Sequence, residues 1–414
     1  MMGKKICFLI LFLVPLTGCY DQLEVEQQSY VIAIGIDKAD EEGRFRITFQ
    51  AANPEVGSTI SSGGSQEEPR ETVTLEGTDL IATKDTANSV MTKQIALDHT
   101  KVVVVSEELA RSGEFLRLIQ AAARTTELRR SVQIIVSKEN ASDFLKNNQP
   151  LLETRPHKYY QYMINRATET GIIPEADIHR FFQITEGDAD AFLAIYATTQ
   201  QSEEKPQGNE DQYIAGQIPL EGGNPTQFMG SAVFKEGKMI DVLSGQETRI
   251  ANILDDTMEM EALYSTYPDP KNKKYRIAAN FSKDRSIDVK IDYRKNQPTK
   301  INVTVPFTIE VIGVPSLIDY SQNEKNRALL EAYIPKVVEE EANNLIKKTQ
   351  EEYKTDAFYW SLYIRKYFST IEEYEKADWN HTIYPNAEIN VNFKLKQLYF
   401  GKMIDDSNIG EVRD

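Results

Sequence analysis

Cys19 is the residue whose surroundings point most clearly to chemistry. It follows Leu16-Thr17-Gly18, and the small residues before it would let a signal peptidase reach the backbone between Gly18 and Cys19. A cysteine thiol in this position can take a diacylglyceryl group, which places two acyl chains in a bilayer, and two chains are what stable anchoring requires. We therefore predict signal cleavage between Gly18 and Cys19 and lipid attachment at Cys19.

The segment before Cys19 has the features of a secretory signal. Met1–Lys5 carries two positive charges, and Ile6–Leu16 is a continuous apolar run. A helix of that length is too short for a hydrocarbon core, which needs about 20 residues, whereas a basic start followed by a short apolar run is typical of a signal peptide. No later stretch is apolar enough to span a membrane, so we expect a lipid-anchored protein on the extracytoplasmic face. A plain signal peptide with a chance cysteine is the alternative.

The charge and the cysteine content exclude several classes of function. The formal charge of −16 becomes about −18 once Lys4 and Lys5 leave with the leader. Such a surface repels nucleic acid phosphates and anionic lipid headgroups, so we expect no nucleic acid partner and a membrane location that depends on the anchor. Because Cys7 lies in the leader and Cys19 carries the lipid, the mature chain has no disulfide framework, cysteine-ligated metal or cysteine nucleophile.

The histidines and the common catalytic motifs give no sign of an enzyme. None of the four histidines has the spacing of a metal-ligand pair on one helical face. There is no phosphate-binding P-loop, no Gly-x-Gly-x-x-Gly after a strand and no Gly-x-Ser-x-Gly elbow. We therefore predict a chain without enzymatic activity and without catalytic, cofactor-binding or metal-binding residues. The histidines are His99, His157, His179 and His381.

Two further groups of residues have a simple structural interpretation. The acidic runs Glu107/Glu108 and Glu339–Glu341 are expected to be solvated helix faces, because the chain is acidic throughout. Tyr159, Tyr160 and Tyr162 are expected in a core or a domain seam, with an interface as the alternative, since aromatic residues are enriched there.

A chain of 414 residues is expected to form two or three domains. The first part predicts a mixed sheet, because buried strands alternate with helices after an antiparallel opening hairpin. The predicted strands are 31–38, 44–51, 71–75, 101–105 and 132–136, the predicted helices are 79–96, 107–125 and one starting in 140–145, and a loop covers 53–70. Helices are expected to dominate residues 150–197.

The second part predicts antiparallel strands followed by long helices. The strands at 275–281, 286–293 and 300–312 alternate apolar and polar residues and have short polar turns, which indicates an antiparallel meander. Strands at 228–243 and a helix at 244–254 precede them. A long helix at 323–353, which Pro335 should kink or divide, is followed by a helix at 357–374 and a final strand at 389–398.

The predicted fold class is α+β, with two or three mixed α/β domains, mixed and antiparallel sheets, and a long helix followed by a final strand. The predicted order is a signal peptide (1–18), an N-terminal α/β domain (19–200), a linker (201–226), a C-terminal α+β domain (227–402) and a tail (403–414). Residues 151–200 either belong to the first domain or form a separate, mostly helical one. These features together describe a membrane-anchored extracytoplasmic binding or scaffold protein.

Five segments, in order along the chain, are similar to one known family. They are Leu16–Asp21, Ile32–Asp37 with Phe45–Pro54, Glu127–Val136, Gly230–Phe234 with Leu243-Ser244-Gly245-Gln246-Glu247-Thr248-Arg249, and Asp378-Trp379 with Tyr384-Pro385-Asn386 and the strand ending at Gly401. With these segments the chain resembles the Ger(x)C family, the lipoprotein C subunit of spore nutrient-germinant receptors. The departures are Tyr20, where the family more usually has tryptophan, and the Gly/Ser-rich loop at 53–70.

The resemblance implies a palmitate-type lipoprotein on the outer face of the spore inner membrane. Its implied partners are two integral membrane subunits of the same germinant receptor, which responds to small nutrients and starts germination. The family has no established catalytic residues or cofactor, so Cys19 is the one functional residue carried over. An alternative is a solute-binding lipoprotein of an importer, although the antiparallel strands at 275–312 argue against two hinged α/β lobes. An extracytoplasmic hydrolase would need a base and a nucleophile that the sequence does not offer.

Overall fold

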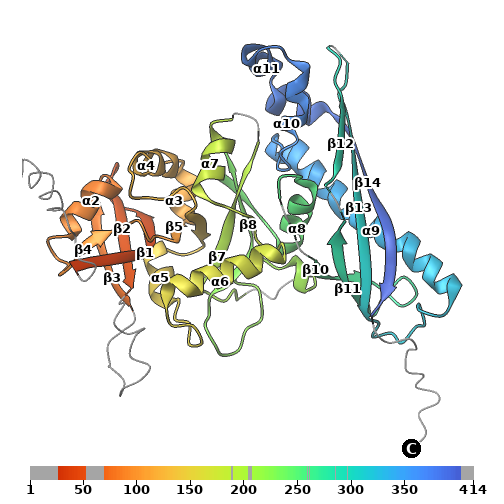
Figure 1. Ribbon diagram of the computed structural model, residues 1–414, viewed down its shortest axis with the longest axis horizontal. Helices are drawn as coiled ribbons and strands as arrows, with labels where there is room; N and C mark the ends of the chain where they lie inside the picture. Colours follow the sequence, from red (N-terminus) through yellow and green to blue (C-terminus); the bar gives the residue numbers. More distant parts are fainter. Residues whose placement is uncertain are drawn as a thin grey trace, which may run out of the picture.

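The computed structural model describes residues 27–52, 70–187, 190–203, 208–258, 260, 262–284, 286–295 and 297–401. The predicted leader, Gly18, Cys19, almost all of the loop at 53–70 and the tail at 403–414 lie outside these residues. The molecule is elongated, with one sheet in each half and helix α8 between them (Figure 1). No helix among the described residues is long and apolar enough to cross a membrane. The mixed α/β class with mixed and antiparallel sheets is confirmed.

The first half is built on a nine-stranded mixed sheet with the order β3-β2-β1-β5-β6-β7-β8-β9 and with β4 beside β1. The strands β1, β5, β6 and β7 are parallel to one another, whereas β2, β3, β8 and β9 join antiparallel at the two ends. The predicted opening hairpin is therefore confirmed. The bounds are β1 (Gln28–Lys38), β2 (Phe45–Ala52), β3 (Arg70–Gly77), β4 (Gln94–Ala96), β5 (Val102–Ser106), β6 (Gln133–Ser137), β7 (Phe192–Thr198), β8 (Gln227–Lys235) and β9 (Lys238–Leu243).

The helices of this half pack on the sheet, but two of them are shorter than predicted. The predicted helix 79–96 begins at its expected cap, Asp79, and ends at Ala87, after which Gln94–Ala96 pairs with β1 as β4. The predicted helix 107–125 is two helices, because Gly113 adopts a left-handed conformation (φ 84°) that ends the first one. The bounds are α2 (Leu80–Ala87), α3 (Glu107–Ser112), α4 (Phe115–Ala122), α5 (Ala141–Asn147), α6 (Pro156–Glu169) and α7 (Ile178–Thr185).

Strand β7 lies inside the region where the sequence predicted mainly helices. All seven of its residues are buried, and they pair with β6 on one side and β8 on the other. The predicted linker, 201–226, connects β7 to β8. These two strands pair with each other in one sheet. The sheet therefore runs past residue 227 to Leu243. Side chains of α6 and α7 belong to the core of this same sheet.

The second half is built on a five-stranded sheet in which β13 is central. Strand β14 pairs parallel with one edge of β13 over residues 300–311, so β11 and β12 lie end to end along the other edge, both antiparallel to β13. In the predicted antiparallel meander, β12 would lie between β11 and β13. That pairing is wrong, because β11 and β12 both pair with β13, whose 14 residues are long enough for the two strands. The bounds are β10 (Leu263–Pro268), β11 (Arg276–Lys283), β12 (Asp288–Asp292), β13 (Lys300–Gly313) and β14 (Glu388–Phe400).

Helix α9 (Glu324–Lys348) covers this sheet as one continuous helix that is not divided at Pro335. Its buried stripe packs in the core of the second half, and this burial offsets the cost of an internal proline, about 3 kcal/mol. The predicted helix 357–374 is instead two short helices, α10 (Ser361–Ile364) and α11 (Ile371–Ala377). The side chain of Thr370 accepts a hydrogen bond from the Glu373 amide and starts α11 anew.

Candidate functional site at the junction of the two halves

Helix α8 (Gly245–Leu254) follows β9 directly and lies between the two sheets (Figure 1). Its start is a capping box, in which Ser244 Oγ accepts the Glu247 amide (3.2 Å) and Glu247 Oε2 accepts the Ser244 amide (2.8 Å). All its residues except Gln246 and Glu247 are buried. A helix that is buried on nearly all sides has packing partners on more than one side, and α8 has them in both halves.

The strands at this end of the first sheet contribute to two apolar cores. Phe192 and Phe234 point into the core of the first half, whereas their neighbours Leu193 and Val233 belong to the core of the second half. Successive side chains of a strand point to opposite faces, so the sheet itself separates the two cores. The halves are therefore joined through buried apolar surface and not through a solvated linker alone.

Asp211 and Arg249 form the polar centre of the junction. Arg249 Nη1 lies 2.5 Å from Asp211 Oδ1, and both side chains are nearly sealed from solvent, at 11 % and 9 % exposure. The second carboxylate oxygen of Asp211 accepts the Thr266 amide (3.0 Å) and the Ser265 hydroxyl (3.2 Å), and Arg249 Nε donates to the Thr170 carbonyl (3.1 Å). One buried ion pair thus connects α8, the 201–226 connection, the end of α6 and β10.

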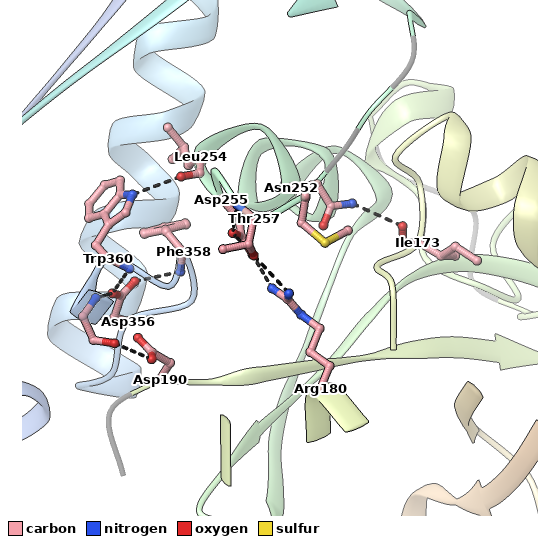
Figure 2. Close-up of polar contacts among 12 residues, drawn as sticks. Ile173, Arg180, Asp190, Asn252, Leu254, Asp255, Thr257, Asp356, Phe358 and Trp360 are labelled. Atoms are coloured by element: carbon pink, nitrogen blue, oxygen red, sulfur yellow. Dashed lines mark hydrogen bonds and ion pairs between the residues drawn. The ribbon is translucent and has the colours of Figure 1, made fainter. Parts of the chain in front are cut away.

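A pair of buried aspartates connects the halves at a second point (Figure 2). The backbones of Asp190 and Asp356 pair as an isolated parallel bridge. The carboxylate of Asp356 accepts the amides of Phe358 and Trp360, each at 2.7 Å, and Ser361 Oγ donates to Asp190 Oδ2 at 2.7 Å. Burial raises the pKa of Asp190 to about 7. Burial and the neighbouring carboxylate of Asp190 also raise the pKa of Asp356 well above its usual range.

Two carboxyls with raised pKa values could serve acid–base chemistry if a substrate could reach them. Asp356 is 0 % exposed and Asp190 is 7 % exposed. Both oxygens of Asp356 are used to hold the backbone of residues 358–361. The pair therefore acts as a structural joint between the segment before β7 and the segment after α9.

The C-terminal end of α8 is held from both halves (Figure 2). From the first half, Arg180 forms an ion pair with Asp255, and the Ile173 carbonyl accepts from Asn252 Nδ2 at 3.2 Å. From the second half, the indole N–H of the buried Trp360 donates to the Leu254 carbonyl at 3.0 Å. This bond satisfies one of the carbonyls that a helix end leaves without a partner.

The four histidines, for which the sequence predicted no catalytic or metal-binding role, are scattered and do not meet at the junction. His99 lies against the Tyr30 ring (4.8 Å between centroids), and His381 Nδ1 lies 3.0 Å from Asp378 Oδ1. His179 is exposed, and burial followed by the charge of Lys158 lowers the pKa of His157. In the part of the chain that the structure describes, no three His, Cys, Asp or Glu side chains could hold a metal ion.

The tyrosines predicted for a core or seam divide into two groups. Tyr159 and Tyr160 are buried in the first core, with their hydroxyls accepting from Asn224 (3.1 Å) and Asn148 (3.2 Å). Tyr162 is 56 % exposed. None of these five residues takes part in the junction contacts of α8.

The acidic runs predicted as solvated faces are in fact partly engaged. Glu107 pairs with Arg111 at 2.7 Å. Glu339 accepts the amide of Phe393 at 3.0 Å and so covers the free edge of β14, while burial raises the pKa of Glu341 to about 7. The prediction of a solvated face is wrong for both residues, because α9 packs against β14 beside Glu339 and against α8, where Glu341 lies beside Gln246.

The junction residues Asp190, Asp211, Asp356 and Trp360 were missed by sequence reasoning. The segment Leu243–Arg249, however, stood out in the sequence, and the structure gives the reason for its residue types. A Cβ added at Gly245 would lie 2.6 Å from Met229 Cε, and Thr248 Oγ1 lies 2.9 Å from Ser231 Oγ. The segment forms the close-packed start of α8.

Comparison with known proteins places both halves in one family. Residues 21–198 match the spore germination protein N-terminal domain, and residues 229–401 match the spore germination B3/GerAC-like C-terminal domain. Spore germination protein B3 of Bacillus subtilis (strain 168) is 23% identical over 410 residues, which cover 96% of this chain and 98% of that protein. Spore germination protein KC of the same organism is 26% identical over 146 residues, 34% of this chain and 36% of that protein.

The fold also matches a solved structure. The crystal structure of the GerBC protein superposes with a TM-score of 0.52 at 19% identity, covering 90% of this chain and 99% of that one. The two domain matches occur in order and together span most of the chain. The chain therefore belongs to the Ger(x)C family of spore germination proteins.

Proposed function

We propose that this protein is the lipid-anchored, extracytoplasmic subunit of a spore germinant receptor. The observation that carries the proposal is the match of both family domains in order, with a relative named for spore germination aligned over 98% of its length. The lipid would be attached to Cys19, after cleavage behind Gly18, and would hold the chain to the outer face of the spore inner membrane.

The proposed subunit acts through contacts with integral membrane subunits of the same receptor and not through catalysis. The buried aspartate pair is closed to substrates, and the junction holds the two halves through apolar packing and buried polar bonds. A partner bound to one half would therefore fix the position of the other. The lipid tether would raise the effective concentration near membrane partners, so that modest affinities suffice.

Deletion of the gene tests this function in spores. In a strain that lacks its other genes of this family, we expect deletion to abolish the fall in optical density that follows nutrient addition. A copy of the gene restored at another locus should return the response. An unchanged response to every nutrient that triggers the parent strain would contradict the proposed function.

A further inference from the structure

The edge of the first sheet where α/β proteins usually bind ligands is already occupied by internal bonds. Ligands of open α/β sheets bind outside the carboxyl ends of the strands. At that edge, Asp37 accepts the amides of Ala141 (2.6 Å) and Ser142 (3.0 Å) and so caps α5. Glu139 accepts the hydroxyl of Thr198 (2.5 Å) and the amide of Thr199 (2.6 Å). These carboxylates are committed to the fold.

An open cleft of about 600 Å³ lies instead at the opposite, amino-terminal ends of β5 and β6. One wall is the face of α6 that carries Tyr160, Ile164 and Thr168, which repeat at a spacing of four residues. The other wall includes Lys101, just before β5, and Gln133, the first residue of β6. This volume lies within the range of small-molecule sites, about 300 to 1,000 Å³.

The two ends of the cleft carry opposite charge. Lys101 lies beside the start of α6, where its charge adds to the effects of burial, Lys158 and Arg155 in lowering the pKa of His157. Glu169 is the last residue of α6, and Glu175 also lines the cleft. Within the described residues, no ion pair within 4 Å engages Lys101, Glu169 or Glu175.

The start of α6 has no acidic side chain to offset the positive end of the helix dipole. Acidic residues are favourable at a helix N-terminus and basic residues at its C-terminus. The first turn of α6 has no acidic residue and contains His157 and Lys158, whereas its last turn carries both Arg166 and Glu169. Of these last two, only Glu169 lines the cleft, so the charged side chains that line it are Lys101 near one end and Glu169 and Glu175 near the other.

The middle of the cleft is uncharged and carries amide groups. Gln161 and Asn165 lie one turn apart on α6 and line the cleft, whereas Gln133 on the opposite wall already accepts the Ala176 amide (3.1 Å) through its side-chain oxygen. From Tyr160 to Glu169, α6 rises about 14 Å at 1.5 Å per residue. An extended chain of about four residues spans that length at about 3.5 Å per residue. Side-chain amides are suitable partners for peptide N–H and C=O groups.

We propose that this cleft binds a short zwitterionic peptide of about four residues. Its carboxylate would face Lys101, its ammonium group would face Glu169 and Glu175, and its backbone would bond to Gln161 and Asn165. The binding itself follows from the cleft, whereas its role as a receptor input rests on the function proposed above.

The test uses the purified, full-length mature protein in detergent and tetra-alanine as the probe, with isothermal titration calorimetry. We expect saturable binding that Lys101→Gln and Glu175→Gln each weaken at least tenfold. Lys138→Gln is the matched control, because Lys138 is an exposed lysine at the other end of β6, and it should leave binding unchanged. Unfolding temperatures of all three variants should match the parent, since none of these side chains supports the core.

Modified peptides identify which charged end of the peptide each residue binds. C-amidated tetra-alanine should bind weakly to the parent, and Lys101→Gln should weaken it no further. N-acetylated tetra-alanine should also bind weakly to the parent, and Glu175→Gln should weaken it no further. Absence of saturable binding, or equal binding by parent and Lys101→Gln, would overturn the proposal. If free alanine bound with the same affinity as tetra-alanine, the ligand would not be a peptide and the proposal would be overturned. Because binding is measured on the isolated protein, these results do not depend on the germination phenotype of the deletion strain.

Discussion

Arg249 on α8 and Asp211 in the connection between β7 and β8 form a 2.5 Å ion pair that is nearly sealed from solvent. Neither residue belongs to a strand of either sheet, yet their bonds reach the end of α6 and β10. This pair is the polar counterpart of the apolar packing that β7 and β8 contribute to both cores. It makes Asp211, which lies within the predicted linker, part of the junction.

Removal of one partner of this pair should be strongly destabilising. Arg249→Met leaves the carboxylate of Asp211 buried without its cation, which costs about 3–5 kcal/mol for buried pairs. We expect the free energy of unfolding, measured by urea denaturation, to fall by about 3 kcal/mol or more. The double variant Arg249→Met/Asp211→Asn should recover part of the loss, because no buried charge remains.

The exposed pair Lys290–Asp288 provides the matched control for Arg249. Its atoms lie at the same distance, 2.5 Å, but the side chains are 74 % and 55 % exposed. Exposed pairs contribute about 0–1 kcal/mol, so Lys290→Met should change the stability little. If Arg249→Met and Lys290→Met have equal effects, the buried pair does not hold the junction.

The buried carboxyls should make the folded protein less stable as the pH rises from about 4 to about 7. The pKa of Asp190 is about 7 in the folded protein, against a usual value of 3.8, so the folded state holds the proton more tightly. The stabilisation is complete below the unfolded pKa and is lost as the pH rises through the folded pKa. One such group gives a slope of up to about 1.4 kcal/mol per pH unit.

Urea denaturation at pH 5, 6, 7 and 8 measures this slope. Asp190→Asn should reduce the slope of stability against pH by about the amount that one titrating carboxyl contributes. Glu341→Gln should flatten it independently, since the pKa of Glu341 is also about 7. The exposed neighbour variant Glu340→Gln is the control. If Asp190→Asn has the same pH profile as the parent, Asp190 is not protonated in the folded protein at neutral pH.

Gly230 on β8 should not tolerate a side chain. Its φ of 89° is left-handed, and an added Cβ would lie 2.3 Å from the Leu243 carbonyl oxygen. Gly222 has a similar φ of 77° but nothing within 4 Å of an added Cβ. Gly222→Ala should therefore cost only the conformational strain, about 1 kcal/mol, whereas Gly230→Ala should cost clearly more. Thermal unfolding compares them, and equal effects would show that the contact with Leu243 relaxes freely.

Cys19 should determine where the protein is found. Cys19→Ala removes the acceptor of the lipid, and the acidic mature chain has little affinity for anionic headgroups. We expect the variant to leave the membrane fraction and to lose most of its germination response. Immunoblots of soluble and membrane fractions measure the first effect. A Cys19→Ala protein that remains membrane-bound and fully active would rule out the lipid anchor.

The strands with strict alternation and the capped helices could be predicted from the sequence. In β13, buried and more exposed residues alternate along nearly the whole strand, and Asp79 starts α2 where its side chain predicted a cap. By contrast, β7 is buried on both faces, and a continuous apolar run does not distinguish a strand from a buried helix. The break at Gly113 depends on a single left-handed residue in an otherwise helical pattern.

The junction itself carries little local signal. Asp211 lies in a polar, glycine-containing connection, where an aspartate that is buried in the fold looks like any solvated one. Asp190 and Asp356 are far apart in the sequence and meet only because β7 and the segment after α9 lie side by side. Their pairing depends on tertiary contacts that no periodic pattern records.

Crosslinking in spore membranes, followed by purification of this protein and mass spectrometry, tests the proposed function most directly. We expect recovery of two polytopic subunits of the germinant-receptor kind, with crosslinked residue pairs that define their interface. Recovery of an importer, or of no membrane partner, would contradict the account and would favour a solute-binding lipoprotein.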